Sequence, residues 1–147
     1  MTHDQAAGRT HGLDVSVVIP VCNEQENVEP LAREIHAALA GRYAFETIFV
    51  DDGSTDGTAQ AVLAAKSAGM PEIRLVRHSL RSGQSAAVAT GVRRSGAPWI
   101  ATLDGDGQND PADIPKLLDT ALQSKSARLR LVMGNRTTRR DTWLRRL

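Results

Sequence analysis

The sequence predicts an α/β protein built on a mostly parallel, Rossmann-like sheet with helices on both faces. Short β-branched apolar runs alternate with segments whose apolar residues recur at helical spacing. The joins are short, and no internal repeat or low-complexity tract interrupts the alternation. Strands joined through helices run parallel, and a chain of 147 residues fits one domain.

The first strand and helix are the best-marked elements. "VSVVIP" (15–20) is an apolar run typical of a strand covered on both faces. The helix expected over residues 27–41 carries apolar residues at helical spacing: Val28, Leu31, Ile35 and Leu39. Asn23 or Asn27 is expected to cap it, and Pro30 to fall in its first turn, where proline is tolerated.

The remaining elements follow in the same alternation. Strands are expected over residues 45–52, 73–78, 99–104 and 129–134, and helices over residues 58–69, 83–96 and 113–124. Small residues such as Ala86, Ala87 and Gly91 predict that the helix over residues 83–96 packs close to the sheet.

The two ends of the chain differ from its centre. Residues 1–13 have no apolar core, so we expect a disordered leader and no signal peptide. The last twenty residues hold seven of the 18 basic residues and one acid, and residues 137–147 are expected to form a basic tail or the start of a truncated amphipathic segment. Such a segment can meet anionic lipid. The single cysteine, Cys22, agrees with a cytoplasmic location. The basic end of the chain agrees with a peripheral position at the cytoplasmic membrane face.

Three polar clusters follow three of the predicted strands: "PVCNE", "VDDGSTDGT" and "LDGDGQND". In open parallel sheets ligands bind beyond the carboxyl ends of the strands, so we expect the three clusters to converge on one site. No glycine-rich phosphate loop is present, which argues against kinases and dehydrogenases. Phosphate charge must then be met by a cation and by arginines, of which Arg136 follows the last predicted strand.

"LDGDGQND" is the candidate metal site. Asp104, Asp106 and Gln108 follow one another at a stride of two and offer hard oxygen ligands that suit Mg²⁺ or Mn²⁺. The alternative is an ordinary surface turn. An EF-hand is excluded because its sixth and twelfth positions hold Asn109 and Pro115. A haloacid dehalogenase phosphatase is disfavoured because such enzymes want Thr or Val where Gln108 stands.

The other two clusters admit a structural and a functional interpretation. In "VDDGSTDGT", Ser54 or Asp56 can cap the next helix, while a carboxylate at the strand end can accept hydrogen bonds from a nucleobase or ribose. In "PVCNEQEN", Asn23 and Glu26 resemble a capping box, and Glu24 can reach a ligand over the sheet edge.

Four stretches in this order resemble family 2 glycosyltransferases, in particular dolichol- and polyprenyl-phosphate sugar transferases. They are "VSVVIPVCNEQENV", "TIFVDDGSTDGT", "GQSAAVATGVRRSGAPWIATLDGDGQNDPADIPKLL" and "LVMGNRTTRRDTW". The resemblance implies a GT-A fold and a nucleotide-sugar-binding domain over residues 14–136. It implies metal ligands at Asp104, Asp106 and Gln108, with a catalytic role for the two acids. It also implies contacts with the nucleotide sugar from Pro20, Cys22, Glu24, Val50, Asp52, Asp104, Gly105, Asp106 and Arg136.

The resemblance also implies an activity: inverting transfer of a sugar from a nucleotide-diphosphate sugar to an acceptor, a polyprenyl or dolichyl phosphate. Relatives of this kind are longer, so the chain is expected to be the N-terminal, donor-binding part of such an enzyme. The alternative is a truncated, non-catalytic nucleotide-sugar-binding module. Self-association through an open sheet edge is expected, and a nucleic acid partner is not.

Overall fold

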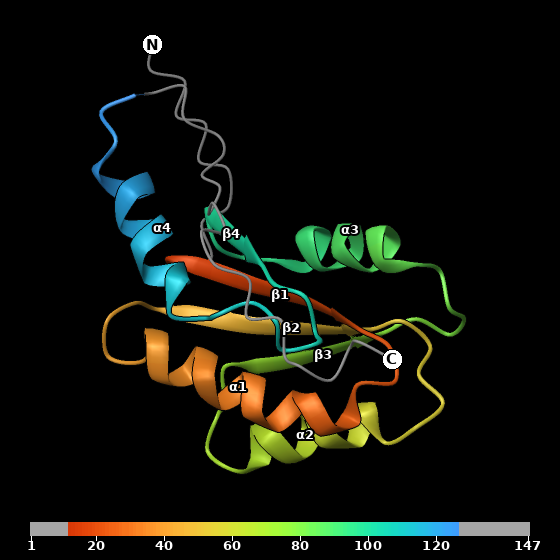
Figure 1. The fold of residues 1–147 in the computed structure, drawn as a ribbon. Helices are drawn as coiled ribbons and strands as arrows, with labels where there is room; N and C mark the ends of the chain where they lie inside the picture. Colours follow the sequence, from red (N-terminus) through yellow and green to blue (C-terminus); the bar gives the residue numbers. More distant parts are fainter. Residues whose placement is uncertain (1–11, 127–147) are drawn as a thin grey trace, which may run out of the picture.

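The fold alternates strands and helices without interruption (Figure 1). The computed structural model describes residues 12–126. In chain order its elements are β1 (Val15–Val21), α1 (Gln25–Leu39), β2 (Phe45–Asp51), α2 (Thr58–Ser67), β3 (Ile73–Arg77), α3 (Gln84–Arg94), β4 (Trp99–Thr102) and α4 (Asp113–Gln123). The strand predicted over residues 129–134 and the tail over residues 137–147 lie outside the described residues, as does nearly all of the predicted leader, 1–13.

The sheet has the order β3-β2-β1-β4, and every strand pair is parallel, as predicted. β1 lies in the middle, with Pro20 opposite Val50 in β2 and Val18 opposite Thr102 in β4. The chain passes from β3 at one side to β4 beyond β1, so the strand order reverses between β1 and β4. That reversal is the position where sheets of this class bind ligands, at the carboxyl ends of the strands.

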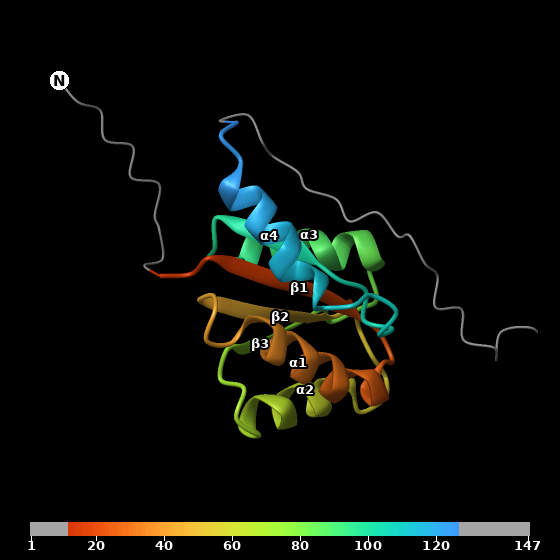
Figure 2. The same ribbon diagram turned by 60° about the vertical axis from the view of Figure 1, so that its left-hand side comes forward.

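Helices cover both faces of the sheet, as predicted (Figures 1 and 2). α1 and α2 pack on one face, and α4 joins them there through Ile114 and Leu118. α3 packs on the opposite face in a smaller cluster with Val18, Ile48 and Val50. Because both faces of β1 are covered, all seven of its residues are buried, which explains its mostly apolar sequence. Its polar residue, Ser16, donates its hydroxyl to Oε1 of Glu46 at 2.6 Å.

α3 lies very close to the sheet because it presents small residues to it. Ala87 and Gly91 are its buried residues. A Cβ added at Gly91 would lie 2.3 Å from Cγ1 of Val18 and 3.1 Å from Cγ2 of Val50. The prediction that this helix presses against the sheet is confirmed.

The predicted start of α1 was wrong. The helix begins at Gln25, with Glu24 at the N-cap position and no side-chain cap. Neither Asn23 nor Asn27 caps it, and no capping box forms with Glu26, because the Asn23 side chain bonds the loop after β2 instead. Pro30 therefore lies beyond the first turn, on the exposed side of the helix, and cannot bond the carbonyl of Glu26.

β4 is shorter and less buried than expected. It ends at Thr102 rather than at residue 104, and its residues alternate between half-buried and exposed. Leu103 still donates its N–H to the carbonyl of Val18, at 3.2 Å, and the chain then leaves the sheet. Asp104 consequently lies in the loop beyond β4, next to the carboxyl ends of β1 and β4.

Candidate functional site

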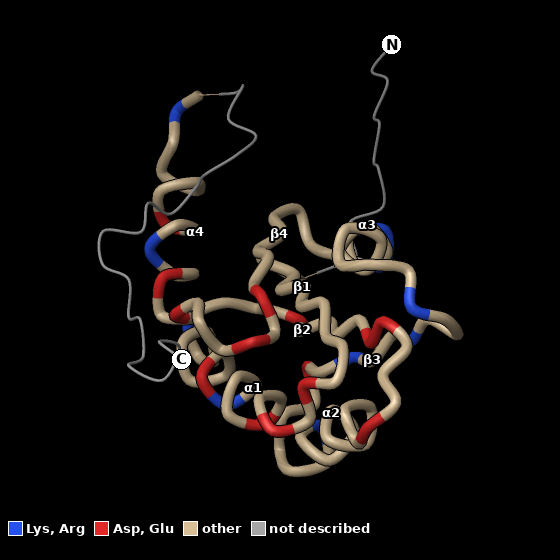
Figure 3. The backbone as a smooth tube through the Cα atoms, turned by 45° about the vertical axis from the view of Figure 1, so that its right-hand side comes forward, with Lys and Arg blue, Asp and Glu red and all other residues tan. Residues whose placement is uncertain are grey.

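The loops that follow β1, β2 and β4 gather at the carboxyl edge of the sheet, and acidic residues run along them (Figure 3). These acids are Glu24, Glu26, Asp51, Asp52, Asp56, Asp104, Asp106 and Asp110. The convergence predicted for the three polar clusters is therefore confirmed. The residues of these clusters differ in burial and in hydrogen bonding. These differences distinguish residues that stabilise the loops from residues that can contact a ligand.

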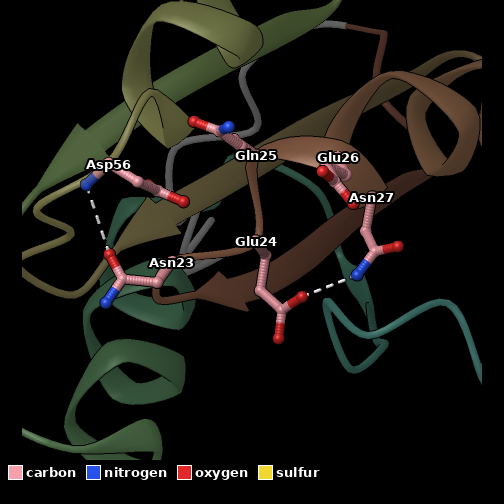
Figure 4. A pocket seen from close by; sticks show the side chains of 6 residues that line it. All are labelled: Asn23, Glu24, Gln25, Glu26, Asn27 and Asp56. Atoms are coloured by element: carbon pink, nitrogen blue, oxygen red, sulfur yellow. Dashed lines mark hydrogen bonds between the residues drawn. The ribbon is translucent and has the colours of Figure 1, made fainter.

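Asn23 ties the β1–α1 loop to the β2–α2 loop (Figure 4). Its Oδ1 accepts the N–H groups of Thr55 at 2.9 Å and of Asp56 at 3.3 Å, while its own N–H donates to Oγ of Ser54 at 2.9 Å. Asn23 takes a left-handed backbone conformation (φ 53°) to do so. Thus neither Ser54 nor Asp56 is the cap of α2: the N-cap is Gly57, with no side-chain cap. Ser54 bonds across the loops, and Asp56, one residue earlier, accepts the N–H of Thr58 at 2.9 Å.

Glu24 lies between these loops and the open edge. Its N–H donates to Oγ1 of Thr58 at 3.0 Å, and its Oε2 accepts from Nδ2 of Asn27 at 2.6 Å (Figure 4). An open polar pocket is lined here by Asn23, Glu24, Gln25, Glu26, Asn27 and Asp56. The Oε1 atom of Glu24 has no partner among the described residues and remains available to a ligand.

Pro20 and Val50 lie near the ends of β1 and β2, while Cys22 and Gly105 lie in the loops after β1 and β4. Val50 is fully buried opposite Pro20, and Cys22 is half-buried with a free thiol. Gly105 is buried against β1: an added Cβ would lie 2.7 Å from Cγ1 of Val21 and 2.8 Å from the carbonyl oxygen of Pro20. Only glycine allows the β4–α4 loop to touch the end of β1 in this way, which brings Asp104 and Asp106 to the switch point.

Asp52 is a buried carboxylate with three donors from the protein. Its Oδ1 accepts Nδ1 of His78 at 2.8 Å and the N–H of Ser82 at 2.7 Å, and its Oδ2 accepts the N–H of Gly83 at 2.8 Å. Burial raises the pKa of Asp52, but the hydrogen bonds from His78, Ser82 and Gly83 outweigh it and hold the pKa below its ordinary value of 3.8. Asp52 is therefore ionised at neutral pH and anchors the loop between β3 and α3.

Asp104 and Asp106 are exposed, in contrast to Asp52. Oδ1 of Asp104 accepts Nε2 of Gln84 at 2.8 Å, and Oδ1 of Asp106 accepts the N–H of Gln108 at 3.0 Å. The Oδ2 atom of each acid accepts no hydrogen bond from residues 12–126. The Gln108 side chain is exposed as well.

The oxygen donors of Asp104, Asp106 and Gln108 are of the kind that hard divalent cations prefer. No group of three or more His, Cys, Asp and Glu side chains that could hold a metal lies within residues 12–126. Mg²⁺ is usually held by one or two carboxylates together with substrate phosphates and water, and Asp104 and Asp106 supply two carboxylates with free oxygens. Arg136, the arginine expected beside the phosphates, lies outside the described residues.

Sequence reasoning missed Gln84 and His78. Both bond predicted site acids, at sequence separations of 20 and 26 residues. Gln84 directly follows Gly83, which has φ 97° and occupies the N-cap of α3. In the sequence, Gln84 could have been recognised as a candidate site residue because it is a polar residue directly after a glycine at a strand-to-helix junction.

The strand order, the helical layers and the acidic loops define an α/β domain of the GT-A type. Among solved structures, similar folds occur in a mannosyltransferase from Pyrobaculum calidifontis in complex with GDP-Man and Mn²⁺ (TM-score 0.59, 30% identity), covering 70% of this chain and 30% of that chain. The fold is also similar to glucosyl-3-phosphoglycerate synthase from Mycobacterium tuberculosis (TM-score 0.62, 23% identity), over 78% of this chain and 41% of that one.

The chain belongs to glycosyl transferase family 2, whose profile matches residues 16–146. It is 39% identical over 132 residues to the dodecaprenyl-phosphate galacturonate synthase of Rhizobium johnstonii, a match that covers 88% of this chain and 38% of the relative. It is 38% identical over 134 residues to the undecaprenyl-phosphate 4-deoxy-4-formamido-L-arabinose transferase of Sodalis glossinidius, over 90% of this chain and 40% of the relative. The chain thus spans about two fifths of the length of these curated relatives.

Proposed function

We propose that this chain binds a nucleotide-diphosphate sugar through a divalent cation, as the donor-binding part of an inverting glycosyltransferase. The observation that carries the proposal is the exposed pair Asp104 and Asp106, brought to the switch point of the sheet by the contact of Gly105 with β1. The family membership and the two polyprenyl-phosphate sugar transferases support the donor class and a polyprenyl-phosphate acceptor.

The roles of the residues follow from their surroundings. Asp104 and Asp106 hold Mg²⁺ or Mn²⁺ through their free oxygens, with Gln108 as a neutral oxygen ligand. When bound, the cation offsets the negative charge that develops on the leaving nucleotide diphosphate. The mannosyltransferase with bound GDP-Man and Mn²⁺ supports this arrangement.

The nucleoside is expected to lie over the ends of β1 and β2. Pro20, Cys22 and Glu24 line one side, and Val50 and Asp52 the other, with Gly105 between them and the phosphates. Arg136 is expected to pair with the diphosphate. Since Oδ2 of Asp52 accepts one bond from residues 12–126, that of Gly83, it retains a lone pair for a ribose or base donor.

A polyprenyl phosphate needs little activation as an acceptor. Its phosphate is ionised near neutral pH, so attack on the sugar requires no strong general base. No helix within residues 12–126 is long and apolar enough to cross a bilayer. We propose a peripheral position at the cytoplasmic face of the membrane, where such an acceptor is presented. Self-association through the free edge of the sheet also stays a prediction.

Calorimetry with a panel of nucleotide-diphosphate sugars, with and without Mn²⁺, tests the proposal on the full chain. We expect binding that depends on Mn²⁺ and is lost in Asp106→Ala. Asp113→Ala is the matched control, because it removes an exposed acid of α4 whose one side-chain bond is to Lys116. Equal binding by wild type and Asp106→Ala in the presence of Mn²⁺, or wild-type binding that does not depend on Mn²⁺, would refute the metal site.

Turnover with a polyprenyl phosphate then separates an enzyme from a binding module. Release of nucleotide diphosphate together with formation of the glycosylated polyprenyl phosphate supports the hypothesis that the chain is an enzyme. Mn²⁺-dependent donor binding with no product over long incubation supports the alternative, a non-catalytic nucleotide-sugar-binding module.

A further inference from the structure

Gln84, the first residue of α3, bonds the loop beyond β4. Its Nε2 donates to Oδ1 of Asp104 at 2.8 Å across 20 residues of sequence. Within residues 12–126, Gln84 is the side chain that bonds this carboxylate. The bond therefore determines how Asp104 is held when no ligand is near.

The position of Gln84 is itself fixed from two directions. The N–H of Gly83, the preceding residue, donates to Oδ2 of Asp52 at 2.8 Å, and Asp52 is 3% exposed at the end of β2. Two turns further along α3, Gly91 seats the helix against Val18 and Val50. The amide of Gln84 thus reaches Asp104 from a helix anchored to the sheet rather than from a free loop.

The chemistry of the amide suits this task. Asp104 and Asp106 carry like charges two residues apart, and their repulsion favours orientations that turn the carboxylates away from each other. A donor N–H₂ on Oδ1 of Asp104 restricts rotation of this carboxylate and leaves Oδ2 open. Because the amide is neutral, it does not repel an incoming cation as a lysine ammonium would.

We propose that Gln84 is a positioning residue that holds the Asp104 carboxylate in the orientation that binds the divalent cation. The proposal rests on the metal site put forward above and extends it to α3. Partners of metal-binding carboxylates are a general feature of metal sites, and their removal typically weakens metal affinity about 10- to 100-fold. Because Gln84 is exposed, we expect the low end of this range.

Mn²⁺ titration of the full chain, followed by the electron paramagnetic resonance signal of free Mn²⁺, tests the role directly. The titration is run with saturating GDP and, separately, with saturating UDP. Gln84→Ala and Gln84→Met should each weaken Mn²⁺ binding about tenfold. Gln84→Met keeps most of the side-chain bulk while deleting the donor, so equal effects assign the loss to the hydrogen bond.

Gln60→Ala is the matched control, since it removes an exposed glutamine of α2 on the far side of the sheet. Its Mn²⁺ affinity should equal that of wild type, and the melting temperatures of all three variants should agree. Asp106→Ala identifies which proposal fails. If Asp106→Ala loses Mn²⁺ while both Gln84 variants keep wild-type affinity, the positioning role alone is wrong. If Asp106→Ala and wild type bind alike, the metal site is wrong and the positioning role falls with it.

Discussion

The contact between α3 and the sheet can be tested by adding one methyl group at Gly91. The Cβ of an alanine would lie 2.3 Å from Cγ1 of Val18, 3.1 Å from Cγ2 of Val50 and 3.3 Å from Cβ of Val18. Carbon atoms in contact normally lie about 3.5–4.0 Å apart, so the helix must retreat by about 1 Å. Val18 cannot easily give way, because it is fully buried in the central strand and β-branched side chains are stiff at χ1.

The expected cost combines two opposing effects. Overpacking of a buried site costs about 1–3 kcal/mol, and three close contacts with two fully buried valines place Gly91→Ala near the upper value. Alanine is favoured over glycine inside a helix by about 1 kcal/mol. The free energy of unfolding should therefore fall by about 2 kcal/mol, which lowers the melting temperature by several degrees.

Urea unfolding followed by far-UV circular dichroism measures the change. Ser85→Ala, on the exposed side of the same helix, should stay within about 0.5 kcal/mol of wild type. Since the retreat of α3 also moves Gln84, the Mn²⁺ affinity of Gly91→Ala should fall as well. A Gly91→Ala protein as stable as wild type, or more stable, would refute the close approach of α3 to β1.

Three further predictions concern the loops and the opposite edge of the sheet. Gly105→Ala should weaken Mn²⁺ binding by about tenfold, measured as above, because its Cβ would lie 2.8 Å from the carbonyl oxygen of Pro20 and displace both site acids. Glu46→Gln should cost about 2 kcal/mol at pH 7 in urea unfolding. Burial raises the pKa of Glu46, but its bonds to Ser16, Arg74 and Gly96 lower it below 4.5. This stability is therefore fully present above pH 4.5 and is lost as the pH falls through the lowered pKa, so the difference between the variant and wild type should shrink toward acid pH. Asn23→Ala should lower the melting temperature more than Asn23→Gly, since both lose the loop bonds but only glycine tolerates φ 53° without strain.

The fold could be predicted from the sequence because its signals are local. The alternation of apolar runs identified every strand and helix that lies within residues 12–126, and small residues such as Gly91 correctly indicated a close helix. The predicted boundaries were wrong where a long-range hydrogen bond determines the local conformation. Asn23 satisfies the rules for a helix cap, yet its side chain bonds Thr55, 32 residues away, and α1 begins without a cap. β4 ends at Thr102, before the acids expected at its tip.

The candidate site was predictable in composition and place but not in its internal roles. Three acidic clusters follow strand ends, and ligands of parallel sheets bind beyond the carboxyl ends of the strands. Together these two observations predicted the edge of the sheet at which the structure gathers the three loops. The glycine before Gln84 marked a polar residue at a helix start, but the one-dimensional pattern did not indicate which acids Gln84 and His78 bond, because both are brought there by the β3-to-α3 turn. Such contacts depend on the relative positions of loops, which hydrophobic periodicity does not encode.

Burial and the number of donors distinguish acids that look alike in the sequence. Asp52 is 3% exposed and receives three bonds from the protein, so most of its charge is already compensated and its main work is to hold the start of α3. Asp104 is exposed, and within residues 12–126 it receives one side-chain bond, which leaves its Oδ2 open. A cation gains most where a carboxylate is oriented but not yet compensated, and Asp104 meets that condition whereas Asp52 does not. The acid that follows β2 thus supports the acid in the loop after β4. Asp52 fixes the start of α3, α3 carries Gln84, and Gln84 orients Asp104.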